Sequence, residues 1–298
     1  MKVRIGIGLG ARSGVDDQER FRLVVDEAER LRFDSLWVSE RLAGPGPDPT
    51  VAMTVAAART ERLKFGPAVM VLPGRNPVVL AKTMASLDVL SGGRLLPAFG
   101  LGAPQLAEHG AFGVRREDRA PIFDEALGLM RRLWSEESVT HHGEHFHVDD
   151  VVVLPKPQQD PLEVWLGGVA PSELRRVGRL ADGWIPSFVT VDDVERGIAT
   201  VNEVATSHDR AIDPEHFGVL IPYANAPIDD AVREFLSARR PEVDFEDIVA
   251  PDLDSLAKMI GRYCDVGASK FVVVPFGPLA DVTAQLEELA EVVRPLEN

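Results

Sequence analysis

The chain has 298 residues, of which 45% are hydrophobic and 27% are charged, and its formal net charge is −15 at pH 7. This length and apolar content allow a large buried core, and the negative charge argues against general affinity for nucleic acid or anionic membranes. The single cysteine, Cys264, excludes internal disulfides and multi-cysteine metal sites. We identify no signal peptide and no apolar run long enough to cross a bilayer, so we expect a cytoplasmic protein.

Strand and helix patterns alternate along the whole chain. Eight strands are predicted, at residues 3–9, 35–39, 64–72, 95–99, 163–166, 184–188, 217–222 and 270–275. Helices are predicted at residues 18–31, 49–59, 77–91, 120–134, 172–181, 191–207, 229–239, 253–266 and 282–293. Eight strands alternating with helices is typical of an α/β (β/α)8 TIM barrel, and a doubly wound open sheet is the alternative. No Pro/Gly/Ser-rich linker divides the chain, so we expect a single domain over residues 1–298.

Residues 138–157 interrupt this alternation. The segments 139–142 and 145–154 flank Gly143 and predict a hairpin, an insertion between the fourth helix and the fifth strand. Its four histidines resemble a metal-binding tract: His141, His142, His145 and His147. Strand alternation would point them to both faces, however, so we interpret the segment as a solvated hairpin and predict no metal site.

Glycines recur at the ends of predicted strands. Residues 6–11 formally satisfy a G-x-G-x-x-A dinucleotide fingerprint, but Gly6 and Gly8 lie inside the first strand, and helical periodicity begins only near Glu19. We therefore interpret them as glycines that allow close approach of a ligand or a neighbouring strand. The fourth strand ends in Gly100 and Gly102, where bare backbone can also approach a ligand.

Many short motifs occur in order along the chain. They are SLWVSER (35–41), NPVVLAKTMASLDVLSGGR (76–94), GLG (100–102), AFG (111–113), PKP (155–157), WLGG (165–168) and ADGWIP (181–186). Together they resemble the bacterial luciferase-like monooxygenase superfamily of flavin- and deazaflavin-dependent oxidoreductases, including its coenzyme F420-dependent branch. The resemblance covers the chain to about Trp184 and weakens afterwards.

This resemblance implies a (β/α)8 barrel with an insertion after its fourth helix, usually as a homodimer. It implies that FMN or coenzyme F420 lies over the carboxyl ends of the strands. It also implies a cis peptide bond between Ala68 and Val69, in the strand that faces the cofactor ring. Hydride transfer needs little side-chain chemistry, so glycines and apolar residues at strand ends are candidates beside those that the resemblance implies. The predicted cofactor-binding residues are Gly8, Arg41, Ala68, Val69, Phe99, Gly100, Gly102, Gly167, Gly168 and Val169.

The end of the second strand departs from the family pattern. Relatives commonly carry an acid followed by histidine there, whereas this chain has Glu40 and Arg41. Arginine stays charged and cannot act as a general base, but it can hold an anion while Glu40 orients it. A salt bridge at the barrel rim is the alternative for Arg41. His109 and Tyr223 complete the set of catalytic candidates, Tyr223 as a proton donor at the end of the seventh strand.

Three functions are compatible with these residues. The leading hypothesis is an oxidoreductase that transfers hydride between coenzyme F420 and a small organic substrate. The first alternative is an FMNH2-dependent luciferase-like monooxygenase, and the second is a barrel that binds flavin without turnover. Relatives that oxidise sugar phosphates place a glutamate after the fourth strand, where this chain has Ala103, so that activity is not expected.

Overall fold

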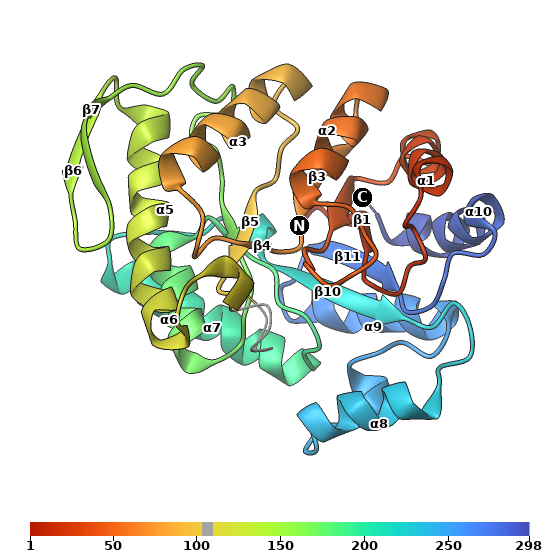
Figure 1. Ribbon diagram of the computed structural model, residues 1–298. Coiled ribbons are helices and arrows are strands. Elements are labelled where there is room, and N and C mark those ends of the chain that lie inside the picture. The colour runs from red at the N-terminus through yellow and green to blue at the C-terminus, as the bar shows by residue number, and fades with distance from the viewer. Residues whose placement is uncertain (103–109, 298) are drawn as a thin grey trace.

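A computed structural model describes residues 1–102 and 110–297 and shows helices arranged around central strands (Figure 1). The strands are β1 (Arg4–Leu9), β2 (Ser35–Val38), β3 (Lys64–Pro67), β4 (Met70–Val71), β5 (Ala98–Gly100), β6 (Val139–His142), β7 (His147–Val151), β8 (Trp165–Leu166), β9 (Gly183–Trp184), β10 (Gly218–Tyr223) and β11 (Lys270–Pro275). The α-helices are α1 (Gln18–Arg30), α2 (Pro49–Arg59), α3 (Pro77–Ser91), α5 (Arg119–Ser135), α6 (Pro171–Leu180), α7 (Val191–Ser207), α8 (Asp230–Arg239), α9 (Leu253–Asp265) and α10 (Val282–Val293). Each predicted helix has a counterpart, and so does each predicted strand, although several strands are shorter than predicted and one is divided.

Helix boundaries follow the capping residues of the sequence. The side chain of Asp48 accepts hydrogen bonds from the first turn of α2, and that of Asn76 does the same for α3. A proline follows each cap, at the helix position that needs no N–H. Gly92, with φ of 73°, ends α3 in the left-handed conformation. These local signals explain why the predicted helix ends agree with the structure to within a residue.

The strands form two parallel sheets and one antiparallel hairpin. The sheets have the orders β10-β11-β1-β2-β3 and β4-β5-β8-β9, and β6 pairs with β7. Parallel bridges join the two sheets at both junctions, between Phe65 and Leu95 and between Ser187 and Leu220. Because all strands of both sheets run parallel, their carboxyl ends gather at one edge, where ligands of such folds bind.

The third predicted strand is divided between the two sheets. Pro67 at the end of β3 still pairs with Val38 of β2, whereas Met70 in β4 pairs with Phe99 of β5. The predicted cis peptide bond between Ala68 and Val69 is confirmed and lies between the two segments. The expected single strand over residues 64–72 is therefore two short strands.

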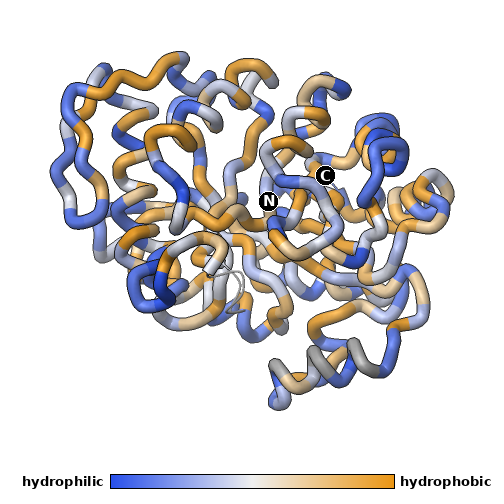
Figure 2. The backbone as a smooth tube through the Cα atoms, viewed as in Figure 1, coloured by the Kyte–Doolittle hydropathy of each residue, from blue (hydrophilic) through white to orange (hydrophobic). Residues whose placement is uncertain are grey.

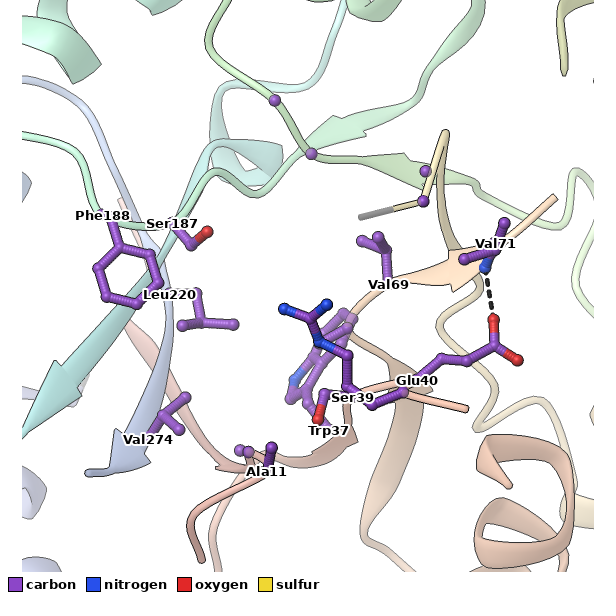
Figure 3. Close-up of a pocket in the computed structure, with 18 of the residues that line it drawn as sticks. Ala11, Trp37, Ser39, Glu40, Val69, Val71, Ser187, Phe188, Leu220 and Val274 are labelled. Carbon is purple, nitrogen blue, oxygen red and sulfur yellow. Dashed lines mark hydrogen bonds between the residues drawn. The ribbon is translucent and has the colours of Figure 1, made fainter. Parts of the chain in front are cut away.

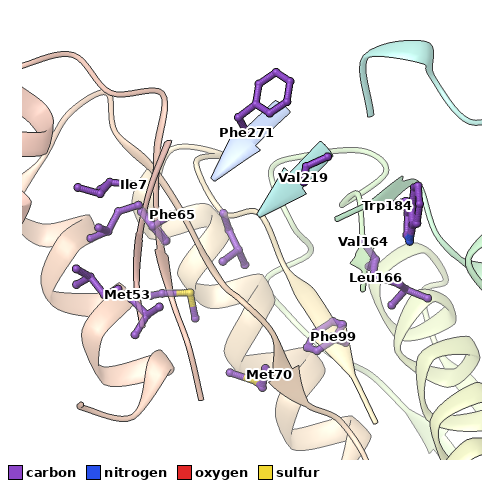
Figure 4. Close-up of a cluster of buried hydrophobic side chains, with 14 of the residues drawn as sticks. Ile7, Met53, Phe65, Met70, Phe99, Val164, Leu166, Trp184, Val219 and Phe271 are labelled. Carbon is purple, nitrogen blue, oxygen red and sulfur yellow. The ribbon is translucent and has the colours of Figure 1, made fainter. Parts of the chain in front are cut away.

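Apolar side chains fill both faces of the strands. The large cluster between strands and helices includes Ile7, Phe65 and Phe271 (Figure 4), and the apolar residues of the central strands stand out in Figure 2. A second cluster on the opposite face includes Trp37 and Val274. Strand alternation explains this division, since neighbouring residues point to opposite faces, and parallel strands buried on both faces are rich in apolar residues.

Two glycines of β1 allow close contact with the neighbouring strands. A Cβ atom on Gly6 would lie 2.3 Å from Ser35 Oγ, and one on Gly8 would lie 2.6 Å from a methyl group of Val274. Side chains would collide at both positions. The close approach that we expected at these glycines is confirmed for the neighbouring strands.

The hairpin β6–β7 is fastened to α5 by one carboxylate. Glu125 accepts hydrogen bonds from the backbone N–H groups of His145 and Phe146, each at 2.9 Å, and lies 2.9 Å from His141 Nε2. Burial raises the pKa of Glu125, but these hydrogen bonds outweigh it and hold the pKa below its ordinary value. Within the described residues, no group of three or more His, Cys, Asp or Glu side chains is arranged to hold a metal ion.

None of the described helices combines the length and apolar character needed to cross a membrane.

A buried ion pair lies at the amino-terminal end of the strands. Lys270, with a side chain 3% exposed, donates to Asp34 Oδ2 at 2.6 Å, and its ammonium group lies 5.8 Å from the ring centroid of Trp37. Burial lowers the pKa of Lys270, and Asp34 opposes that shift. The two chain termini lie close by (Figure 1), where Glu297 accepts a hydrogen bond from the N–H of Ile5.

The Lys270→Met variant should be destabilised by about 3–5 kcal/mol, because it leaves the Asp34 carboxylate buried without its cation. The same change at Lys258, which is exposed on α9, should cost less than about 0.5 kcal/mol. Urea unfolding of both variants measures the difference. Equal destabilisation of the two would contradict this account of the pair.

Candidate functional site

A cavity of about 490 Å³ opens at the carboxyl ends of the parallel strands. Ligand pockets commonly have volumes of roughly 300–1,000 Å³. Ten of the predicted site residues line it: Gly8, Glu40, Arg41, Ala68, Val69, Phe99, Gly100, Gly102, Gly167 and Gly168. These residues come from five different strand ends and are brought together only by the parallel arrangement.

Two of the described predicted site residues are not brought to this cavity. Tyr223 and Val169 are absent from its described lining. His109 lies outside the described residues.

Strand parity explains the position of Tyr223. Along β10, Leu220 and Pro222 line the cavity, whereas Val219, Ile221 and Tyr223 belong to the cluster between strands and helices. The Tyr223 hydroxyl is buried without a hydrogen-bond partner in the described part of the chain, and burial raises its pKa well above the ordinary value. The Tyr223 side chain therefore lies on the helix side of β10. It does not line the described cavity, where a proton donor would have to lie.

The N–H group of Val169 already has a partner. Glu173, in the first turn of α6, accepts hydrogen bonds from the backbone N–H groups of Val169 and Ala170, each at 2.9 Å. This is the arrangement in which a glutamate of the first turn reaches back over the helix start. The backbone N–H of Val169, which we expected among the cofactor-binding residues, is therefore engaged by a contact within the chain.

Several glycines form part of one wall of the cavity, and these positions contribute no side chains to it. A Cβ atom on Gly100 would lie 2.5 Å from a methyl group of Val69, so only glycine allows Val69 to pack against β5. Gly102 and Gly168 have φ values of 89° and 96°, which favour glycine. The described wall around Val69 is therefore formed by glycine backbone and an apolar side chain.

Glu40 connects the ends of two strands (Figure 3). Its Oε2 atom accepts a hydrogen bond of 2.6 Å from the N–H of Val71, and its other oxygen pairs with Arg75. Arg75 also donates through Nε to the carbonyl oxygen of Val71 at 2.8 Å. Burial raises the pKa of Glu40, while Val71 and Arg75 favour its ionised form. Both carboxylate oxygens are thus engaged in holding β4, which makes Glu40 a positioning residue.

Charged side chains in the described lining are three arginines and two glutamates. Besides Glu40 and Arg41, they are Arg12, Glu173 and Arg176. The Nε of Arg176 lies 2.5 Å from Asp124 Oδ1, which fixes its guanidinium group beside the cavity. Sequence reasoning missed Arg12 and Arg176. The signal for Arg176 was its place eight residues after Gly168, on the first turns of the helix that follows the glycine pair.

We expect Glu40→Ala to lower the free energy of unfolding by about 2–4 kcal/mol, because it strips the buried Val71 N–H and Arg75 of their acceptor. Glu40→Gln should cost less, since its amide oxygen can still accept from Val71. The matched control is Glu61→Ala at an exposed position. Chemical denaturation of the three variants gives the comparison, and a loss in Glu40→Ala no larger than in the control would refute the role of Glu40.

A family model described as luciferase-like monooxygenase matches residues 2–263. The chain is 26% identical to an F420-dependent glucose-6-phosphate dehydrogenase of Amycolatopsis mediterranei, over 90% of this chain and 91% of the relative. It is 32% identical to a protein of the same name from Kineococcus radiotolerans, over 53% of this chain and 49% of the relative, so this match spans about half of the relative's length.

Solved structures of similar fold carry related descriptions. An F420-dependent secondary alcohol dehydrogenase in complex with an F420-acetone adduct superposes with a TM-score of 0.83 at 20% identity, over the full length of both chains. The coenzyme F420-dependent tetrahydromethanopterin reductase of Methanopyrus kandleri gives a TM-score of 0.79 at 19% identity, also over both full chains. These similarities establish the fold, and the family match establishes descent: the chain belongs to the luciferase-like monooxygenase family.

Proposed function

We propose that this protein is an oxidoreductase that transfers hydride between coenzyme F420 and a small organic substrate. The observation that carries the proposal is the convergence of ten expected site residues on one cavity. The relatives named F420-dependent, which align over most of both chains, favour this cofactor over FMN. FMN remains the alternative, in line with the description of the family as monooxygenases.

The wall around Val69, formed by glycine backbone and an apolar side chain, would accept a planar ring system. Gly100 and Gly167 contribute no side chains there, and Val69 presents a methyl-bearing surface. Bound F420 would supply the ring carbon that accepts or donates hydride. The chain's own residues would hold the ring and exclude water, with Val69 as the apolar contact.

The anionic tail of the cofactor requires local positive charge in a protein of net charge −15. Arg41 and Arg176 both line the cavity and would provide it. Glu173 lies on the same side of the cavity as Arg176. A Cβ atom placed on Gly168 would lie 2.7 Å from the Glu173 carboxylate. We assign the tail to this arginine-bearing side and expect Glu173 to oppose its binding.

The proposal also covers the closure of the barrel and the number of domains. We infer that the two sheets form one closed (β/α)8 barrel within a single domain over residues 1–298, and that the hairpin β6–β7 is an insertion in it. The bridges at both sheet junctions support closure. A homodimer and a cytoplasmic location remain predictions from the family resemblance.

Titration of the purified protein with F420 and with FMN tests the proposed cofactor. Trp37 lines the cavity, so its fluorescence should report binding. We expect micromolar affinity for F420 and much weaker affinity for FMN. The reverse order would favour the monooxygenase, and binding of neither would leave a barrel without this cofactor.

Arg41→Gln should weaken F420 binding about tenfold or more, equivalent to roughly 1.4 kcal/mol, because it removes a cation from the cavity. Arg22→Gln, an exposed change on α1, provides the control for the altered net charge. The same fluorescence titration measures both. If the two variants bind F420 equally well, Arg41 lies outside the cofactor site.

Glu173→Gln should tighten F420 binding severalfold. Glutamine can still accept hydrogen bonds from Val169 and Ala170, so the start of α6 is preserved while a negative charge beside the anionic tail is removed. A salt series should show the gain shrinking at high ionic strength. Unchanged or weaker binding at low salt would argue against placing the tail on this side.

A further inference from the structure

The side of the cavity opposite Val69 is lined by larger apolar side chains. Figure 3 shows Phe188, Leu220 and Val274 on one side of the open space and Val69 on the other. Leu220 and Val274 come from β10 and β11, in the opposite sheet from β4 and β5. If the cofactor ring occupies the Val69 wall, these three side chains face the position of the substrate.

The orientation of Leu220 and Val274 follows from the alternation of side chains along a strand. Val274 belongs to the buried cluster on the cavity face of the strands, and Leu220 packs against the same cluster. The register pairs Leu220 with Val272, so β10 and β11 present apolar side chains side by side. Phe188, held at a positive φ of 54°, follows β9 and adds an aromatic ring to the same wall.

Among the described residues, few polar groups reach this wall. Ser187 contributes a hydroxyl group to the described lining, with no hydrogen bond to a described residue. Besides Arg176, the arginines of the described lining are Arg41, assigned above to the cofactor, and Arg12. Arg12 is exposed at the rim and lies with its guanidinium carbon 5.7 Å from the ring centroid of Phe276.

The lysines of the chain lie outside the cavity lining. None of the six lines the cavity, and Lys64 and Lys270 lie at the amino ends of their strands, away from it. A phosphorylated sugar needs clustered cations for its phosphate and many hydrogen-bond partners for its hydroxyl groups. The described wall offers it one hydroxyl and apolar side chains.

We propose that the Phe188–Leu220–Val274 wall binds a neutral, mainly apolar alcohol or its carbonyl product, with the substrate oxygen hydrogen-bonded to the Ser187 hydroxyl group. The substrate class thus differs from that of the relatives named glucose-6-phosphate dehydrogenases. This inference rests on the proposed function for the identity of the hydride carrier.

The reaction balances with that carrier. In the oxidising direction the carbinol C–H bond breaks and its electron pair leaves with the hydrogen as hydride to oxidised F420. The hydroxyl proton passes to water, and the C–O bond becomes a C=O bond. The alcohol loses two electrons and F420 gains them; reduction of the carbonyl compound is the reverse.

A homologous series tests the wall. With F420 as acceptor, kcat/KM should rise about fourfold for each methylene from 2-butanol to 2-hexanol, as burial of apolar surface requires. Glucose 6-phosphate should be oxidised at least a hundredfold less efficiently than 2-hexanol. A flat series, or preference for glucose 6-phosphate, would overturn the substrate class while leaving the proposed cofactor in place.

A binding measurement separates this inference from the proposed function. The cofactor-free protein should bind 2-hexanone, followed by tryptophan fluorescence, and Leu220→Asn should weaken that binding about tenfold without changing F420 affinity. Leu90→Asn, at a position 85% exposed on α3, is the matched control. Failure of F420 to bind would refute the proposed function alone. Absence of 2-hexanone binding, or equal binding by Leu220→Asn and the control, would refute the apolar wall.

Discussion

The shape of the cavity depends on the contact between the Glu40 carboxylate and the backbone of Val71. β2 ends at Val38, so the N–H of Val71, further along the neighbouring chain segment, has no strand beside it to accept its hydrogen bond. Glu40 supplies the missing acceptor, and Arg75 satisfies both the carboxylate and the Val71 carbonyl group. The Glu40 side chain thereby continues the backbone hydrogen bonding and holds β4, which follows Val69 of the glycine-rich wall.

Local charge at the cavity differs from the charge of the whole protein. A net charge of −15 repels anions at long range, but screening limits that repulsion to about 8–10 Å at physiological ionic strength. Within the cavity the described lining carries three arginines against two glutamates, and Glu40 is neutralised by Arg75. On the proposed function, selection of the anionic cofactor would depend on a few side chains, among them Arg176, which Asp124 holds in place.

Sequence reasoning succeeded where the signal is local. Caps such as Asp48 and Asn76 act on the next few residues, so the helix ends were predictable, and glycines at strand ends marked most of the cavity wall. It failed where the answer depends on assembly. Tyr223 ends the right strand but points to the helix side, and Arg12 and Leu220 join the cavity only once the sheets come together. The N–H of Val169 donates a hydrogen bond to Glu173, in a capping pattern that is visible in the sequence.

The central claim is that the cavity has two halves, a glycine-rich wall for the cofactor ring and an apolar wall for the substrate. A crystal structure of the protein with F420 bound tests this division most directly. The account predicts the ring against Val69 and Gly100, the anionic tail toward Arg176, and free space beside Leu220 and Val274. A ring lying against Leu220 and Val274, or bound outside the cavity, would contradict it.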